Sequence, residues 1–212
     1  MQLVKKFEIQ SKKKMIDFLN NQPAGRVASI DKDGYPQVIP MNFVYADSVI
    51  YMHSHPFGEK LENIRRNPSV GFEVDQHICF LPSYYFHPTD ASQADTLYIS
   101  VVIKGRADIV EEKAEKAKAL NALMEKYQKE GRYEALDANM PVVHEVAIIK
   151  VTPLDMRGKY KIGQHWARPY RLKMAKNIIA REGLEAARPV LAVMNVIVEG
   201  DGTMEIVEDP VM

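Results

Sequence analysis

The residues best suited to chemistry in this chain lie between His53 and Lys60, where a strand pattern meets a helix pattern. The expected strand ends in His53-Ser54, and Pro56 suits the first position of a following helix. The N–H groups at a helix start have no partner within the helix, and the helix dipole favours an anion there. Lys60 opposes that dipole unless an anion also binds. We predict a site where a phosphate accepts from Lys60, the Ser54 hydroxyl and backbone amides. The alternative is a solvated lysine beside Glu59.

The two histidines next to this point are weaker candidates. Ser54 or His55 is expected to cap the helix, and His53 and His55 alternate along a strand, so their imidazoles face the same side. Two imidazoles could begin a metal site, but no third ligand follows at close spacing, so no metal is expected. Cys79, the single cysteine, lies in no His–Cys signature and is expected to be a buried structural thiol.

The single tryptophan, Trp166, follows Gln164-His165 in a basic loop that contains glycine. A loop tryptophan can stack on an aromatic ligand or anchor a subunit contact, and it can equally be a packing residue. The chain contains neither the dinucleotide-binding motif G-x-G-x-x-G nor the phosphate loop G-x-x-x-x-G-K-[ST], and nothing resembles a nucleophile elbow.

Short strands dominate the first third of the chain. Lys32-Asp33-Gly34 is typical of a tight turn between two strands, with the glycine supplying a positive φ. Pro40, inside the second of these strands, indicates an edge strand or a bulge because proline has no N–H to donate to a ladder. The elements expected here are a helix at residues 12–21, strands at 25–31, 35–45 and 49–54, and a helix at 56–67.

The rest of the chain alternates strands with helices. Gly105 is expected to form a bulge or bend between two strands. The expected elements are strands at residues 70–74, 96–104, 106–110 and 142–154, an irregular excursion at 77–94, a long helix at 111–129, a basic helix at 170–181 and a hairpin at 190–207 turning at Gly200-Asp201-Gly202. This order predicts a mainly β fold, a small barrel with helices. The apolar faces around Val101 and Ile149 are expected to exceed what one small barrel buries.

Composition excludes several classes of protein. Lys plus Arg and Asp plus Glu each total 28, and this zero formal charge argues against a general nucleic-acid binder. The hydrophobic share of 46% is ordinary for a globular protein. Apolar runs such as residues 190–198 are too short to cross a bilayer, and the N-terminus lacks a signal-peptide core. With a single cysteine, a cytoplasmic protein without membrane association is expected.

A long run of the sequence, residues 25–75, resembles the pyridoxamine-5′-phosphate-oxidase-like, FMN-binding split-barrel superfamily, and within it the nitroimidazole-resistance-type flavin proteins. The features that carry the resemblance are a Gly-Arg strand, an Asp-Gly turn, a Pro-x-Asn-Phe strand, a His-Ser strand end and Gly-x-Lys-Leu-x-x-Ile-Arg-x-Asn-Pro. Further matches are Ser100-Val101-Val102 before Gly105, and Gly158-Lys159-Tyr160-Lys161 before Gln164. The resemblance covers roughly residues 20–165.

The resemblance implies a homodimer of six-stranded antiparallel split barrels with FMN at each subunit interface. Residues 1–165 would form the FMN-binding domain, and residues 166–212 a C-terminal extension, a basic helix and hairpin, packed on it. By that resemblance, the strand that contains Val38, Ile39, Pro40, Met41 and Asn42 would run along the flavin ring. The phosphate would be held by His53, Ser54 and Lys60. The ring or its edge would be approached by Lys161, Gln164 and Trp166. Relatives with the Gly-Lys-x-Lys-x-x-Gln pattern often continue with Asn-Arg, whereas this chain has His165-Trp166.

The function expected from this resemblance is an FMN-dependent oxidoreductase that cycles its flavin with a reduced nicotinamide donor, NADH or NADPH, and reduces a small-molecule acceptor. The basic residues that hold pyridoxamine phosphate in the oxidase proper are not recognisable, so that reaction is not expected. The alternatives are a flavin-binding carrier, sensor or regulator without turnover, and a haem-handling split barrel with His165 as the axial ligand.

Overall fold

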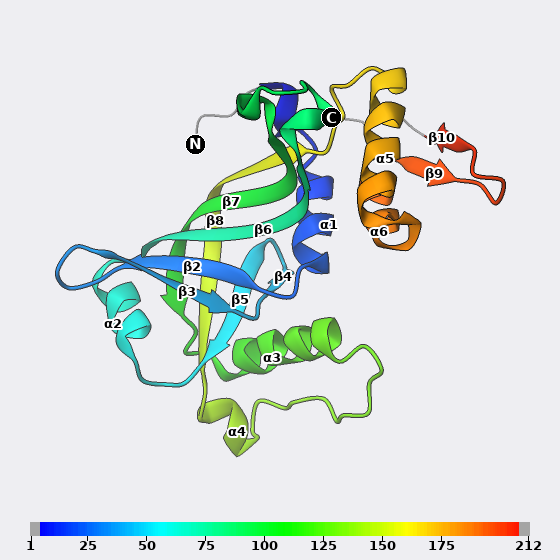
Figure 1. The fold of residues 1–212 in the computed structure, drawn as a ribbon. Helices are drawn as coiled ribbons and strands as arrows, with labels where there is room; N and C mark the ends of the chain where they lie inside the picture. Colours follow the sequence, from blue (N-terminus) through cyan, green and yellow to red (C-terminus); the bar gives the residue numbers. More distant parts are fainter. Residues whose placement is uncertain (1–4, 208–212) are drawn as a thin grey trace. The chain divides into compact units, whose positions relative to one another are not determined.

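The fold described here is that of a computed structural model, which describes residues 5–207 (Figure 1). The helices are α1 (Lys12–Asn21), α2 (Glu59–Arg66), α3 (Lys113–Tyr127), α4 (Pro141–His144), α5 (Arg168–Glu182) and α6 (Leu184–Val193), with three short 3₁₀ turns, η1 (Lys5–Phe7), η2 (Ser83–Tyr85) and η3 (Ala91–Gln93). The strands are β1 (Glu8–Ile9), β2 (Gly25–Ile30), β3 (Pro36–Met41), β4 (Val44–Ala46), β5 (Val49–Ser54), β6 (Ser69–Leu81), β7 (Asp95–Ile109), β8 (Ala147–Lys161), β9 (Val196–Val198) and β10 (Met204–Ile206).

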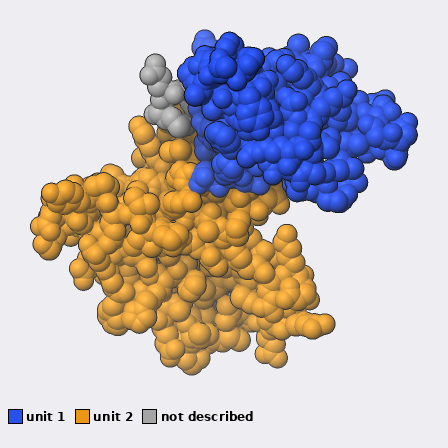
Figure 2. Space-filling model, viewed as in Figure 1, with its two compact units in different colours: residues 1–11, 75–100, 158–212 blue, residues 12–74, 101–157 orange. Residues whose placement is uncertain are grey.

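The chain forms two compact units, shown in separate colours in Figure 2. The first contains residues 1–11, 75–100 and 158–212, and the second contains residues 12–74 and 101–157. The long strands β6, β7 and β8 each begin in one unit and end in the other, because the boundaries fall inside them.

Eight strands form one sheet with the order β3-β2-β6-β7-β8-β5-β4, and β1 pairs with β8. The pairs β2–β3, β2–β6, β4–β5 and β5–β8 are antiparallel. The mainly β fold class with helices is therefore confirmed, and the sheet has eight strands where six were expected. Strand β3 stands at one end of the order, which confirms the edge position that Pro40 predicted.

Glycines explain two close approaches within the second unit. Gly105 was expected to interrupt its strand, but β7 continues through it, so that prediction is wrong. A Cβ at Gly105 would lie 2.6 Å from Val151 Cγ1 and 2.9 Å from the Thr152 carbonyl oxygen. Glycine at position 105 therefore allows β7 and β8 to approach each other, because a side chain there would collide with β8. Gly25 is similar, because its Cβ would lie 2.2 Å from the Phe72 ring.

Several element boundaries differ from the sequence prediction. The strand expected at residues 35–45 is divided into β3 and β4, which stand at opposite ends of the sheet order. Strand β6 runs on to Leu81, so residues 77–81 of the expected irregular excursion are sheet. Strand β8 begins only at Ala147, because residues 141–144 form the short helix α4 behind Pro141. The C-terminal hairpin is confined to β9 and β10, since residues 190–193 complete α6.

Separate clusters of apolar side chains stabilise the two units. In the second unit, α3 packs on β4 and β5, with Val44, Tyr51, Leu123 and Ile148 buried between them. In the first unit, α5, α6 and β9 share a cluster with the ends of β6 and β7; its members include Cys79, Leu81, Leu97, Met174, Ile178, Leu191 and Val196.

Two sequence predictions are decided by the burial of the side chains concerned. Cys79 is only 8% exposed, and burial raises the pKa of its thiol, as expected of a structural cysteine. Val101 and Ile149 are fully buried by the chain itself, so their apolar faces need no partner subunit.

Candidate cofactor site

The connection from β5 to α2 begins with a buried hydroxyl. Ser54, 4% exposed, donates from Oγ to the carbonyl oxygen of His55 at 3.0 Å, and the Nδ1 of His55 accepts from the Phe57 N–H at 3.3 Å. Helix α2 starts one residue after Gly58, which has φ 140° and no side-chain cap. The prediction that Ser54 or His55 caps this helix is therefore wrong, and glycine is needed because other residues rarely adopt this φ.

Lys60 is the second residue of α2 and is half-buried. Its neighbour Glu59, the partner that a simple solvated lysine would have, accepts a 2.6 Å hydrogen bond from Gln37 Nε2 in β3 instead. Within residues 5–207, no ion pair joins Lys60 to a carboxylate. A cation in the first turn opposes the helix dipole, so a half-buried lysine here without a counterion favours binding of an anion.

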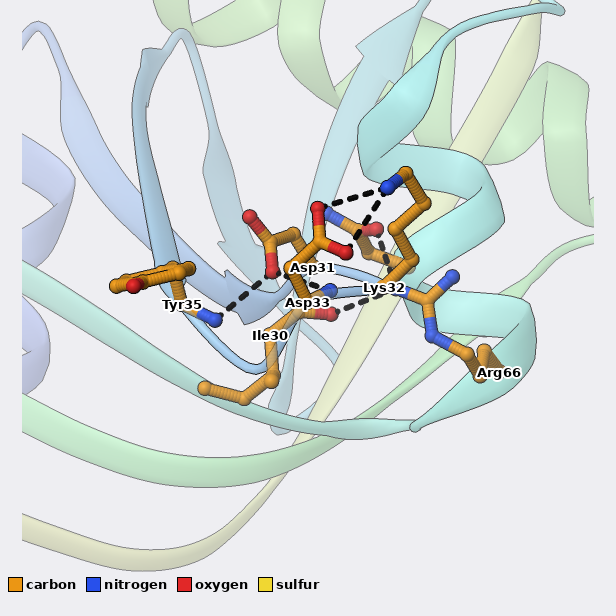
Figure 3. A network of polar contacts seen from close by, with 7 residues as sticks. Ile30, Asp31, Lys32, Asp33, Tyr35 and Arg66 are labelled. Atoms are coloured by element: carbon orange, nitrogen blue, oxygen red, sulfur yellow. Dashed lines mark hydrogen bonds and ion pairs between the residues drawn. The ribbon is translucent and has the colours of Figure 1, made fainter.

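Polar contacts fix the start of α2 beside β2 and β3. Asn63, 1% exposed, donates from Nδ2 to Ser29 Oγ and to Gln37 Oε1, both at 3.3 Å. Arg66 donates to Asn63 Oδ1 at 2.7 Å and to the Ile30 carbonyl oxygen at 3.0 Å, so it ties the helix to the end of β2 (Figure 3). These contacts hold Lys60 and the edge strand in a fixed relation, because Gln37 touches both Asn63 and Glu59.

The turn between β2 and β3 is built as its sequence predicts. The Asp31 carboxylate accepts from the N–H groups of Asp33 and Tyr35 at 2.9 and 2.8 Å (Figure 3), and Gly34 has φ 89°. The register then places Val38 opposite Ala28. Val38 is 56% exposed although it is apolar, so β3 presents both its free edge and an apolar side chain at the surface.

The end of this edge strand is held by the last residues of α3. Tyr127 OH accepts from the N–H of Phe43 at 2.9 Å and lies 2.8 Å from the Pro23 carbonyl oxygen. Lys126 Nζ lies 3.6 Å from the centroid of the Phe43 ring and donates to the Leu19 carbonyl oxygen at 3.2 Å. Burial lowers the pKa of Lys126 to about 8. Because Asn42 directly precedes Phe43, these contacts also restrict the backbone of Asn42.

The third predicted group lies in the other unit. Lys161 forms an ion pair with Asp95. Gln164 closes the loop that follows β8: its Oε1 accepts from the Ile162 N–H at 3.0 Å and its Nε2 donates to the Tyr160 carbonyl oxygen at 2.6 Å. Trp166 packs at the edge of the apolar cluster of this unit, near Phe86 and Tyr170.

Close packing shapes this loop. A Cβ at Gly163 would lie 2.4 Å from the Trp166 ring, and its φ is 78°. Trp166 therefore packs closely against its own loop, and only a glycine fits at position 163. His165 is exposed, and its ring makes an edge-to-face contact with the Phe7 ring at 5.0 Å between centroids. Desolvation and the charges of Lys6 and Lys161 lower the pKa of His165, whereas Asp95 raises it.

The predicted site residues are divided between the two units. Residues 38–42, His53, Ser54 and Lys60 belong to the second unit, with His53 exposed at the end of β5. Lys161, Gln164 and Trp166 belong to the first. Among residues 5–207 there is no cluster of three or more His, Cys, Asp or Glu side chains that could hold a metal ion.

Comparison with known proteins gives this arrangement a family. A family model described as pyridoxamine 5′-phosphate oxidase matches residues 11–160. The chain belongs to the pyridoxamine 5′-phosphate oxidase family. This confirms the resemblance found in the sequence, and the match includes the edge strand β3, the β5–α2 connection and most of β8. No curated protein matches the chain significantly.

Solved structures share the fold of this pyridoxamine 5′-phosphate oxidase family member. A candidate 5-nitroimidazole antibiotic resistance protein from Bacteroides thetaiotaomicron is 28% identical, with a TM-score of 0.61; the match covers 72% of this chain and 85% of that one. A conserved hypothetical protein from Mycobacterium tuberculosis is 22% identical over 76% and 90% of the two chains, with a TM-score of 0.59.

A flavocytochrome from Azotobacter vinelandii is 16% identical over 76% of this chain and 72% of that one, with a TM-score of 0.64. At this level of identity the flavocytochrome and the Mycobacterium tuberculosis protein show the common fold only. In addition, no helix within the described part of the chain is long and apolar enough to span a membrane.

Proposed function

We propose that this protein binds FMN and acts as an oxidoreductase that takes electrons from a reduced nicotinamide donor and passes them to a small-molecule acceptor. The observation that carries the proposal is Lys60: a half-buried ammonium group without an ion pair in residues 5–207, in the first turn of a helix fixed beside an exposed edge strand. A phosphate monoester satisfies such a lysine and the free helix N–H groups together.

The chain's own residues supply binding and orientation. The backbone of residues 38–42 offers the free edge of β3 to the rim of a planar ring, and the helix start with Lys60 holds the phosphate. His53 and Ser54 lie at the end of β5, five and four residues before Gly58. Lys161, Gln164 and Trp166 are proposed for the ring edge on the resemblance alone. When bound, FMN supplies the electron and hydride transfer chemistry, which the protein does not perform itself.

The family resemblance also supports a homodimer with a flavin at each subunit interface. The exposed apolar residues of the β2–β3 hairpin, Ile30, Tyr35 and Val38, give a second copy a surface to cover. Sedimentation of the FMN-loaded protein should give twice the chain mass at low concentration. A monomer with its full complement of FMN would overturn this part of the proposal.

The test of the oxidoreductase activity is anaerobic. Protein loaded with FMN and mixed with NADH or NADPH should lose its visible flavin absorption, and a nitro compound or another oxidant should restore it. A protein that binds FMN but keeps its absorption in the presence of both donors is a carrier or sensor rather than an oxidoreductase. A haem spectrum in the purified protein would replace the flavin proposal altogether.

A further inference from the structure

A cluster of lysines in the first unit surrounds one aromatic ring. Around the Phe7 ring, the ammonium groups of Lys6, Lys159 and Lys161 lie 4.9, 5.6 and 5.9 Å from the centroid. Lys159 also lies 5.1 Å from the Tyr98 ring centroid. A cation over an aromatic face is a common contact. Three lysines around one ring, however, place like charges within about 12 Å of one another. This separation is close to the ~8–10 Å screening length of physiological salt, so the charges still repel one another.

The backbone holds these lysines in place although they are far apart in the sequence. Strand β1 pairs with β8, which sets Glu8 opposite Lys159 and Ile9 opposite Gly158. Gln164 Nε2 donates to the Lys6 carbonyl oxygen at 3.1 Å, so the loop after β8 also holds η1. The backbone segments that carry the three lysines are therefore held together within the folded unit.

The charges in this cluster are not balanced within the described chain. Lys161 is paired with Asp95. Within residues 5–207, no ion pair joins Lys6 or Lys159 to a carboxylate, even though Glu8 lies opposite Lys159. Desolvation is the main cause of the lowered pKa of His165, and the charges of Lys6 and Lys161 lower it further while Asp95 raises it. An anion bound here would relieve the repulsion among the lysines.

We propose that the Lys6–Lys159–Lys161 cluster binds the diphosphate of a nucleotide, and that this nucleotide is the reduced nicotinamide donor; the donor's identity rests on the proposed function. Ammonium groups are point-charge donors to phosphate oxygens, and a diphosphate spreads its charge over a distance that separate lysines can span. The Phe7 and Tyr98 rings give the site an aromatic wall, which suits a nucleotide better than an inorganic anion.

The probe is ADP, titrated by calorimetry into the FMN-loaded protein, so that the flavin site is already filled. The variant Lys6→Gln/Lys159→Gln removes the two unpaired charges and keeps chain length and polarity. Lys173→Gln is the matched control: Lys173 belongs to the same unit and lies 5.8 Å from the centroid of the Tyr170 ring, but it is outside the cluster of three lysines. We expect the double variant to weaken ADP and NADH binding at least tenfold, about 1.4 kcal/mol, and the control to stay within twofold.

Raising the salt concentration should weaken ADP binding to the wild type more than to the double variant. The inference would be overturned if the double variant bound ADP and NADH with the same affinities as the wild type does. It would also be overturned if protein that binds FMN showed no binding of ADP at millimolar concentration. The ADP half of FAD is the other source of a diphosphate. If the double variant lowers the affinity of the apoprotein for FAD relative to FMN and leaves NADH binding unchanged, the assignment to the donor is wrong.

This design separates the inference from the proposed function. FMN affinity should be the same in wild type, double variant and control, because none of the substitutions replaces a residue proposed to contact FMN. If the purified protein takes up no FMN, the proposed function fails, and the lysine dependence of ADP binding in the same protein still decides whether the cluster is a nucleotide site.

Discussion

The hydroxyl of Tyr127 holds both polar groups of the Phe43 backbone: it accepts from the N–H at 2.9 Å and lies 3.0 Å from the carbonyl oxygen. Phe43 directly follows the segment 38–42 that is proposed to line the flavin ring. A residue 84 positions further along the chain therefore fixes the end of that segment. The contact connects the long helix α3 to the candidate site without placing any α3 side chain in it.

Replacing Tyr127 with Phe should lower the free energy of unfolding by about 1–2 kcal/mol, because the Phe43 N–H loses its acceptor in a partly buried position. Urea unfolding of the protein without added flavin measures this. Tyr84→Phe is the control, since Tyr84 is an exposed tyrosine outside the surface proposed for the second copy. Equal unfolding free energies for Tyr127→Phe and wild type would show that the contact contributes nothing to stability.

Lys126 predicts a pH dependence of stability. Its pKa is lowered to about 8 by burial, whereas in the unfolded chain it is close to the ordinary lysine value, about 10.4. Between these values the unfolded state binds more protons than the folded state, so the contribution of this residue to stability rises with pH through this window. Below pH 8 both states are protonated and the folded protein bears the full cost of the buried charge.

The test compares Lys126→Met with wild type from pH 7 to pH 10. The difference in unfolding free energy should move in favour of the wild type as the pH rises. Lys129→Met makes the same substitution at an exposed position two residues beyond α3 and is the control for the loss of a surface lysine. A difference for Lys126→Met that stays constant with pH would mean that Lys126 keeps an ordinary pKa in the folded protein.

Substitution of Lys60 by Glu should have effects of opposite sign on stability and on binding. A carboxylate in the first turn favours the helix, so the apoprotein should keep its stability or gain up to about 1 kcal/mol. FMN should bind at least tenfold more weakly, about 1.4 kcal/mol, because a carboxylate replaces the cation beside the phosphate. Unfolding with urea and titration with FMN measure the two effects.

Lys104→Glu makes the same charge change at an exposed position of β7 and should leave FMN affinity within twofold of wild type. If Lys60→Glu destabilises the apoprotein and leaves FMN affinity unchanged, Lys60 is structural and the phosphate binds elsewhere.

Local sequence signals predicted much of this fold. The Asp-Gly turn and Pro40 gave the hairpin and its edge strand because turn geometry and missing donors act within a few residues. The α2 prediction was correct in place, but its cap was not: Gly58 starts the helix through its backbone conformation, and no side-chain pattern signals that.

The contacts that fix the site could not be predicted, because their partners are distant in the sequence. Tyr127 lies in the long helix expected at residues 111–129, and nothing near it in the sequence indicates that its hydroxyl meets Phe43. Gln37 and Asn63 likewise meet only when β3 and α2 pack together. A glycine inside a strand pattern is typical of a bulge, and only the close approach of Val151 shows why position 105 is a glycine.

The central claim is that Lys60 and the start of α2 bind the phosphate of FMN, and the most direct measurement compares FMN with riboflavin. The two ligands share the ring and differ in the phosphate, so their affinities for the apoprotein isolate the phosphate contact. We predict FMN binding at micromolar affinity or better, about 8 kcal/mol, and riboflavin binding at least tenfold more weakly, with the difference largely lost in Lys60→Glu. Equal affinity of the wild-type protein for FMN and riboflavin would contradict the claim.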